Sequence, residues 1–311
     1  MLGRLALVPI LLLGLAGCSG EDRLSGASGS KDGGSKGGVT VVATTTQLAD
    51  FATIVGGDHA TVYGVLKANI DPHDYEPSPA DVQQLGAADV IVKNGLDLEG
   101  WFEDTIKAAA PKGQIIEAGD GIEVRKAGDE EEHPEGDPHI WHSPANAKIM
   151  VNGIEEALSK AAPEHAGAYQ RNEAEYIDQL DALDAEVRGQ VARLANKKVV
   201  TNHDAFGYYL DHYGLEFVGS IIPSFDTQAE LSADNISDIV ANIKSSGVKA
   251  VFSESSLPPK TAEAIGKEAG VKVVAGEDAL YGDTLGPEGS GGDSYLKMIR
   301  HNTKALVDNL S

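Results

Sequence analysis

The chain of 311 residues lacks several features that mark common classes of protein. It has a single cysteine, Cys18, which excludes an internal disulfide bond. Its 25 basic residues are outnumbered by 48 acidic residues, and the resulting net charge of −23 argues against binding to nucleic acid or electrostatic adhesion to anionic lipid. This charge suits a soluble body that attracts cations.

Motifs of several enzyme classes are also absent. The sequence contains no G-x-S-x-G, no C-x-x-C and no H-E-x-x-H. The glycine-rich segment GPEGSGGDS (286–294) has no lysine where a phosphate-binding loop requires one. We therefore interpret this segment as a turn and expect the protein not to be an enzyme.

The N-terminus, MLGRLALVPILLLGLAGCSG, has the pattern of a secretory signal. Arg4 precedes an apolar run that is too short to span a membrane, and the residues before Cys18 have the form of a bacterial lipobox. Residues 1–18 are thus predicted to be a lipoprotein signal peptide, with Cys18 as the lipidated residue. Residues 19–38, rich in glycine and serine, are predicted to be a disordered tether. This arrangement predicts an extracytoplasmic protein anchored to the cell membrane.

From Val39 onward, short β-branched segments alternate with amphipathic segments. This alternation predicts an α/β fold with mostly parallel sheets covered by helices. The predicted strands cover 39–44, 60–66, 89–95, 114–119, 198–202, 215–222, 248–254 and 271–275. The predicted helices cover 48–57, 79–86, 99–110, 144–161, 204–214, 232–246, 258–269 and 293–309.

The segment 163–194 departs from this alternation because its apolar residues form one continuous helical stripe. A helix of this length would extend about 48 Å, which is too long for one βα unit. We expect it to be a rigid strut between two βα lobes. The predicted domains are an N-terminal lobe at 39–162, a linking helix at 163–195 and a C-terminal lobe at 196–311.

Two loops share the sequence Asp-Pro-His shortly before a Ser-Pro helix start: DPHDYEPSP contains His73, and DPHIWHSP contains His139. His203 directly follows a predicted strand, and Asp283 lies in the loop after the last one. Open α/β sheets bind ligands at the carboxyl ends of their strands. We therefore expect these four residues to meet in the cleft between the lobes.

Three imidazoles and one carboxylate form a ligand set suited to a borderline divalent metal. His142 is the rival to His139 in its loop, and we favour His139 because it repeats the sequence context of His73. Asp71 and Asp137 either orient an imidazole through its second nitrogen or cap the local backbone. The acidic loop 128–136, with His133, is either simply solvated or weakly gathers cations.

The sequence resembles the solute-binding lipoproteins of bacterial ABC importers for zinc and manganese. The stretches that carry the resemblance extend over nearly all of the chain after Val39. They are the LAGC lipobox, DPHDYEPSP with KNGLDLEGW, DPHIWHSP, the long helix, TNHDAFGYY and LYGDTLGPEGSGGDSYLKMIRHN. The resemblance implies two lobes joined by a rigid helix, one metal at their interface, and ligands at His73, His139, His203 and Asp283.

One departure concerns the metal. Zinc-type members of the family often have a long histidine-rich loop before the second ligand, and here that loop is short and acidic. The ligand set nevertheless predicts Zn²⁺ as the transported ion, with Mn²⁺ as the alternative. We expect a monomer that delivers the metal to the permease of its importer. Two other functions considered are a zinc-dependent hydrolase and an adhesin.

Overall fold

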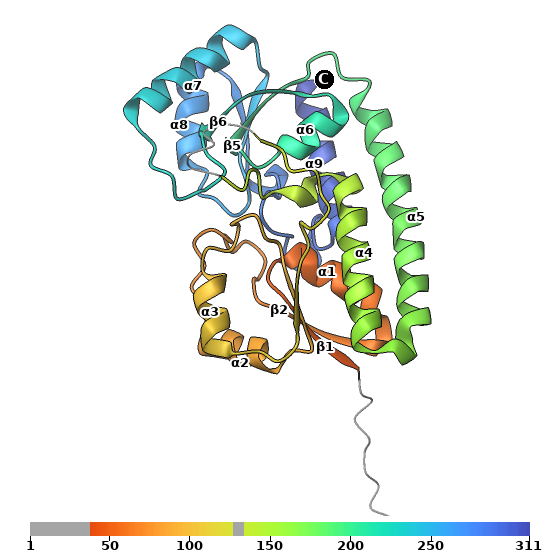
Figure 1. Cartoon of the computed structure of the whole chain (residues 1–311). Coiled ribbons are helices and arrows are strands. Elements are labelled where there is room, and N and C mark those ends of the chain that lie inside the picture. The colour runs from red at the N-terminus through yellow and green to blue at the C-terminus, as the bar shows by residue number, and fades with distance from the viewer. Residues whose placement is uncertain (1–37, 127–133) are drawn as a thin grey trace, which may run out of the picture. The chain divides into compact units, whose positions relative to one another are not determined.

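The computed structural model describes residues 38–126 and 134–311. Within them, two four-stranded sheets are each built from parallel strands. The first sheet has the order β2-β1-β3-β4 and the second β6-β5-β7-β8. This confirms the predicted α/β fold with two lobes (Figure 1). The predicted signal peptide, lipidation of Cys18, the tether up to residue 37 and most of the acidic loop lie outside the described residues.

The N-terminal lobe surrounds the first sheet. Its elements are β1 (Val39–Ala43), α1 (Thr46–Gly56), β2 (Ala60–Gly64), α2 (Pro79–Ala87), β3 (Val90–Lys93), α3 (Phe102–Ala109), β4 (Gln114–Glu117) and α4 (Pro144–Ala161). Strands β1 and β3 are almost fully buried, as expected for parallel strands covered on both faces. Helix α2 begins as predicted, because Ser78 caps its N-terminus in a capping box with Asp81, and Pro79 follows.

The C-terminal lobe surrounds the second sheet. Its elements are β5 (Lys198–His203), α6 (Gly207–Tyr213), β6 (Glu216–Ile222), α7 (Ala233–Ser246), β7 (Ala250–Phe252), α8 (Lys260–Ala269), β8 (Lys272–Val274) and α9 (Tyr295–Leu310). Every predicted helix and strand is present, and most bounds differ by three residues or fewer.

The long helix α5 (Ala166–Val191) extends alongside both lobes, and α4 packs against it (Figure 1). The residues of the predicted stripe that lie in this helix are buried: Tyr169, Tyr176, Leu180, Leu183, Val187 and Val191. Leu194, the last residue of that stripe, lies beyond the end of the helix and is also buried. The helix is shorter than predicted because Pro163–His165 form a separate 3₁₀ turn, η3. At 26 residues it is about 39 Å long.

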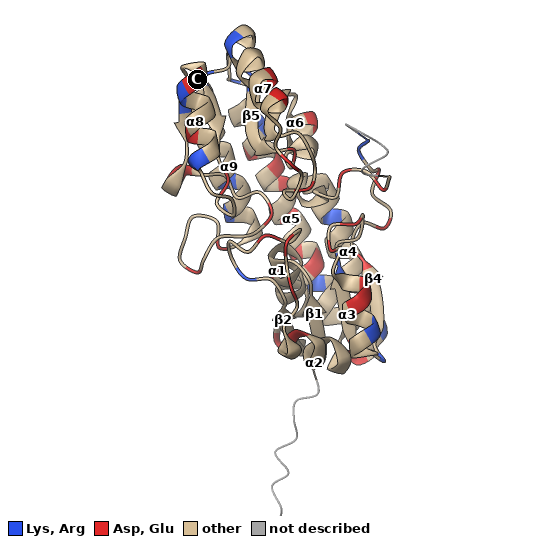
Figure 2. Cartoon of the chain, turned by 90° about the vertical axis from the view of Figure 1, so that its left-hand side faces the viewer, with Lys and Arg blue, Asp and Glu red and all other residues tan. Residues whose placement is uncertain are grey.

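One apolar core joins the two lobes along this helix. Phe51 of α1 contacts Tyr176 of α5 and Tyr295 of α9, with ring centroids 6.0 and 4.9 Å apart. The largest buried cluster includes residues of both sheets as well as of α5 and α9. The lobes therefore share buried surface, which favours a fixed relative arrangement. Figure 2 shows acidic and basic residues spread over both lobes. Among the described residues, no helix combines the length and apolarity needed to cross a bilayer.

Candidate metal centre

Four side chains from four separate loops or strand ends meet between the lobes. His73 follows β2, His139 lies just before the 3₁₀ turn η2 (Ile140–His142), His203 ends β5, and Asp283 follows β8. Each of the four offers a ligand atom, and these atoms all lie within 4.8 Å of one another. We call these residues the His₃Asp cluster. The structure thus brings together all four residues that the sequence pointed to.

The spacing of the donor atoms suits a single ion. The Nε2 atoms of His139 and His203 are 3.3 Å apart, and Asp283 Oδ1 lies 3.5 and 3.4 Å from them. Ligands at 2.0–2.1 Å from a tetrahedral zinc ion are themselves about 3.3 Å apart. His73 Nε2 and both Asp283 carboxylate oxygens are buried and have no hydrogen-bond partner among the described residues. A divalent cation would satisfy all of these atoms together.

Two buried carboxylates orient the imidazoles of His139 and His203 by contacting the ring nitrogen that faces away from the cluster. Asp137 Oδ1 lies 2.8 Å from His139 Nδ1, and Glu254 Oε1 lies 2.9 Å from His203 Nδ1. When the Nδ1 atoms donate to these carboxylates, each Nε2 is left with its lone pair directed into the cluster. This carboxylate–histidine arrangement is typical of metal ligands. Asp137 therefore has the orienting role considered from the sequence, and its Oδ1 also caps the backbone by accepting from the His139 N–H at 3.0 Å.

Asp71 has the other role considered, that of a backbone cap. Its Oδ1 accepts a hydrogen bond from the backbone N–H of His73 at 2.9 Å. Its Oδ2 accepts from the Thr227 hydroxyl of the C-terminal lobe at 2.6 Å. Asp71 thus fixes the His73 loop and ties it across the lobe interface.

The loop that carries Asp283 is held by the N-terminal lobe. Gln47 Nε2 donates to the Asp283 carbonyl at 3.0 Å, and Trp141 Nε1 donates to the Gly282 carbonyl at 3.0 Å. The Thr46 hydroxyl accepts from the Leu285 N–H at 2.8 Å. The fourth residue of the cluster therefore belongs to one lobe by sequence and is positioned by the other.

Burial and charge set the protonation of the cluster. Burial lowers the pKa of His73. At His203 burial acts in the same direction, but the carboxylates of Glu254 and Asp283 outweigh it and raise the pKa above its usual value. Burial alone would raise the pKa of Asp283, yet the histidines, His203 foremost, lower it. Without metal, the cluster therefore favours a proton on His203 beside an ionised Asp283, and a metal would replace that proton.

His142, the rival ligand, lies outside the cluster. Its ring is fully buried and packs on Phe206 with centroids 4.4 Å apart, and burial lowers its pKa to about 3. Sequence reasoning missed Glu254, Gln47 and Trp141. A signal for Glu254 was present, because it follows β7, the neighbour of β5 in the sheet, close to the same edge as His203. His133 lies outside the described residues.

The family of this chain is shown by its similarity to known proteins. Residues 41–309 match the family described as zinc-uptake complex component A, periplasmic. The chain belongs to this family. Its membership confirms the resemblance to metal-binding solute-binding proteins that the motifs indicated.

Proteins similar to this chain are named for manganese or for zinc. The manganese-binding lipoprotein MntA of Bacillus subtilis is 34% identical over 313 residues, which cover 98% of this chain and 99% of that protein. The manganese ABC transporter substrate-binding lipoprotein PsaA of Streptococcus pneumoniae is 29% identical over 315 residues, with 99% and 97% covered. The structure of the periplasmic zinc binding protein TroA from Treponema pallidum superposes with a TM-score of 0.81 at 30% identity, covering 88% of this chain and 100% of that one.

Proposed function

We propose that this chain is the extracytoplasmic substrate-binding component of an ABC importer. It captures one divalent transition metal through His73, His139, His203 and Asp283 and delivers it to the membrane permease. The observation that carries the proposal is the convergence of four buried donor atoms from both lobes, two of them backed by carboxylates. The names of the relatives support the transport role.

We propose further that zinc binds more tightly than manganese. Three imidazoles and one carboxylate suit zinc, whereas manganese prefers oxygen ligands and is the weakest binder of the first-row divalent series. The spacing of 3.3 to 3.5 Å among the donor atoms of His139, His203 and Asp283 is compatible with a tetrahedral zinc ion.

Manganese is the second candidate for the transported metal. It is favoured by the relatives named for manganese, which match nearly the whole chain. The Asp283 carboxylate also favours manganese, because neither of its oxygens has a hydrogen-bond partner among the described residues and bidentate binding would raise the coordination number. Tight binding and transport are separate properties, so zinc can bind more tightly even if manganese is the metal delivered.

The test is a competition titration of metal-free protein with both ions, together with the metal content of protein purified without added metal. We expect zinc to displace manganese at equal concentration. His73→Ala and His203→Ala should each weaken zinc binding at least 10-fold to 100-fold, the range found for partners of ligands. His165→Ala is the matched control, because His165 stacks on His59 away from the cluster. Displacement of zinc by equimolar manganese would contradict the metal assignment but leave the binding role intact.

The membrane anchor is a separate part of the proposal. Relatives are named lipoproteins, and the lipobox ending in Cys18 suggests the same modification here. Cys18→Ala should yield an unprocessed or released protein in membrane fractionation. A parent chain recovered free in the medium with an unmodified Cys18 thiol would refute the anchor.

A further inference from the structure

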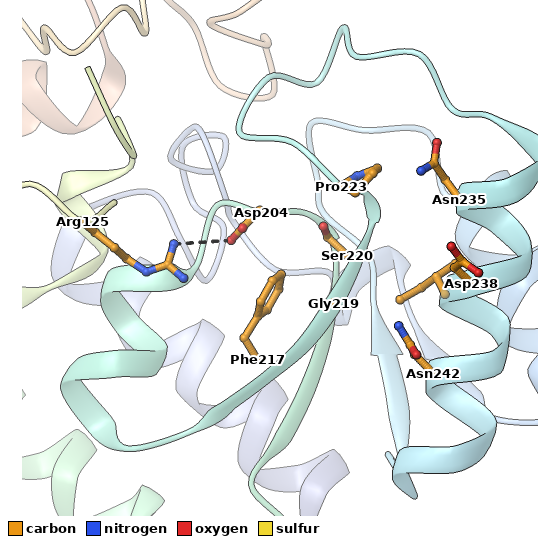
Figure 3. Close-up of a pocket in the computed structure, with 10 residues that line it drawn as sticks. Arg125, Asp204, Phe217, Gly219, Ser220, Pro223, Asn235, Asp238 and Asn242 are labelled. Carbon is orange, nitrogen blue, oxygen red and sulfur yellow. Dashed lines mark ion pairs between the residues drawn. The ribbon is translucent and has the colours of Figure 1, made fainter. Parts of the chain in front are cut away.

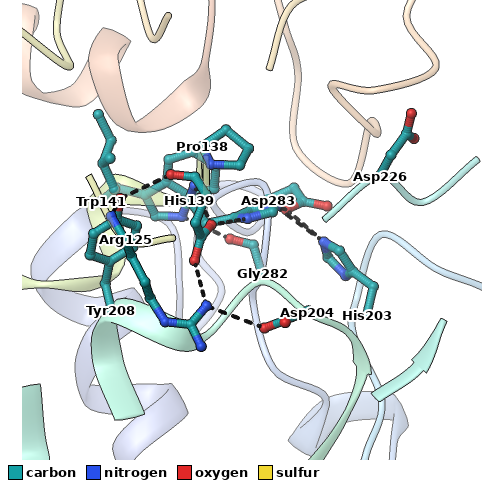
Figure 4. Close-up of polar contacts among 12 residues, drawn as sticks. Arg125, Pro138, His139, Trp141, His203, Asp204, Tyr208, Asp226, Gly282 and Asp283 are labelled. Carbon is teal, nitrogen blue, oxygen red and sulfur yellow. Dashed lines mark hydrogen bonds and ion pairs between the residues drawn. The ribbon is translucent and has the colours of Figure 1, made fainter. Parts of the chain in front are cut away.

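One arginine lies between the carboxylates that adjoin two ligands of the His₃Asp cluster. Arg125, in the loop after β4, contacts Asp137 through Nη1 at 3.1 Å and Asp211 of α6 through Nε at 3.0 Å. The same Nη1 lies 3.8 Å from Asp204 Oδ1 (Figures 3 and 4). Asp137 holds His139, and Asp204 directly follows His203. One guanidinium thus connects the surroundings of a ligand from each lobe.

The surrounding contacts make this position well defined. The Arg125 backbone N–H donates to the Tyr208 hydroxyl at 2.9 Å, and that hydroxyl donates to the Asp137 carbonyl at 3.0 Å. The Asp137 side chain is fully buried, and that of Arg125 is only 17% exposed. Asp137 Oδ1 contacts His139 and Asp137 Oδ2 contacts Arg125, so the guanidinium helps to fix where this buried carboxylate lies.

Gly207, the first residue of α6, provides the space for the guanidinium. A Cβ atom at Gly207 would lie 2.2 Å from Arg125 Nη1 and 2.3 Å from its Cζ. The backbone of Gly207 is helical, so alanine suits its conformation and would favour the helix. Glycine at position 207 therefore makes room for the Arg125 guanidinium and is not required by the helix.

We propose that Arg125 is a positioning residue for the metal centre. Its guanidinium lies against Gly207 and fixes the orientation of His139 relative to His203 across the lobe interface. The inference rests on the proposed function. It predicts that displacing the guanidinium, without touching a ligand, loosens the metal site and speeds release of the ion.

The test compares four variants by zinc affinity and dissociation rate: Arg125→Ala, Gly207→Ala, their double variant, and Lys126→Ala. The first two should each weaken binding by about 10-fold to 100-fold, mainly through faster dissociation. The double variant should bind no worse than Arg125→Ala, because the alanine methyl then has no guanidinium to displace. Lys126→Ala removes a neighbouring exposed cation and should leave affinity unchanged.

Two further measurements separate positioning from general stability. Gly207→Ala should weaken zinc binding more than Val240→Ala, a substitution in the core of the C-terminal lobe that also lowers the melting temperature of the metal-free protein, and a merely structural role would not produce this difference. A cavity of about 400 Å³ borders Arg125 and Asp204 and gives access to the gap left in Arg125→Ala (Figure 3). Millimolar guanidinium should therefore partly restore zinc binding to that variant and not to Gly207→Ala.

The outcomes distinguish this inference from the proposed function. If Arg125→Ala and Gly207→Ala bind zinc like the parent while His139→Ala does not, Arg125 has no positioning role and the metal site stands. If His139→Ala also binds like the parent, the proposed function itself fails. If Arg125→Ala does not fold, the test rests on Gly207→Ala and Arg125→Lys. Zinc binding like that of the parent by both of these variants would overturn the inference.

Discussion

At the scale of single residues, the functional information lies in which nitrogen of each histidine faces the cluster. His139 and His203 both place Nδ1 against a buried carboxylate, so Nε2 is the atom presented to a metal. His142, only three residues from His139, is instead enclosed against Phe206. Burial and hydrogen bonding therefore distinguish the candidate ligand His139 from the core residue His142, whereas the sequence alone does not.

This difference predicts unequal effects of two neighbouring substitutions. His139→Ala should remove most zinc affinity, because it deletes a donor atom of the cluster. His142→Ala should chiefly lower stability, since it leaves a cavity beside Phe206 without removing a ligand. Isothermal titration and thermal melting of both variants check this. If His142→Ala abolishes binding and His139→Ala does not, the ligand is His142.

A second prediction at this scale concerns Glu254. Glu254→Gln keeps a side chain of similar size but replaces the carboxylate that accepts the hydrogen bond from His203 Nδ1. Zinc affinity should fall by about 10-fold to 100-fold, as is typical for partners of metal ligands. Glu263→Gln, at an exposed position of α8, is a suitable control. Equal titration curves for Glu254→Gln and the parent would show that His203 does not depend on this carboxylate.

At the scale of elements, helices α1 and α9 are joined by a partly buried carboxylate. Asp50 of α1 accepts the backbone N–H of Tyr295, the first residue of α9, at 2.8 Å. Burial raises the pKa of Asp50 from 3.8 to about 6, although the Tyr295 hydrogen bond acts in the opposite direction. The folded state therefore binds a proton more tightly than the unfolded chain does, and this carboxyl's contribution to stability falls as the pH rises from about 4 through 6.

Asp50→Asn should therefore stabilise the metal-free protein at pH 7.5. The amide keeps an oxygen for the Tyr295 N–H but carries no buried charge, so the gain is roughly 1 to 3 kcal/mol. The difference from the parent should shrink toward pH 4, where Asp50 is protonated in the folded state. Urea unfolding at both pH values measures this. A variant that is less stable than the parent at pH 7.5 would show that the ionised carboxylate is needed.

The elements themselves were largely predictable, and the contacts between lobes were not. Apolar stretches such as 39–43 and the stripe of α5 follow from local patterns, and the strand-end rule brought His73, His139, His203 and Asp283 together. Gln47 and Trp141 hold the Asp283 loop from 236 and 141 residues away in sequence. Such contacts depend on how the lobes dock, for which a single sequence carries no periodic signal.

At the scale of the whole molecule, the metal would act as a bridge between two lobes that already share a core. Its ligands come from both lobes, and the Asp283 loop is held by Gln47 and Trp141 of the other lobe. An ion that binds only the folded state stabilises it by mass action, by about 2.7 kcal/mol at a free concentration 100 times Kd. The net charge of −23 further favours the approach of cations.

The last prediction is that zinc raises the melting temperature of the whole domain, and that acid abolishes the effect. At pH 7.5 and 100 times Kd, the rise should be several degrees, as expected from about 2.7 kcal/mol for a chain of this size. The rise should shrink as the pH falls toward 5.5, because the histidines must be neutral to ligate and the pKa of His203 is raised by Glu254 and Asp283 against the effect of burial. Calorimetry with zinc and with chelator measures it, and at the same zinc concentration His203→Ala should show a clearly smaller rise than the parent at pH 7.5. A rise of equal size at pH 7.5 and 5.5 would mean that the stabilising ion is not bound by histidines.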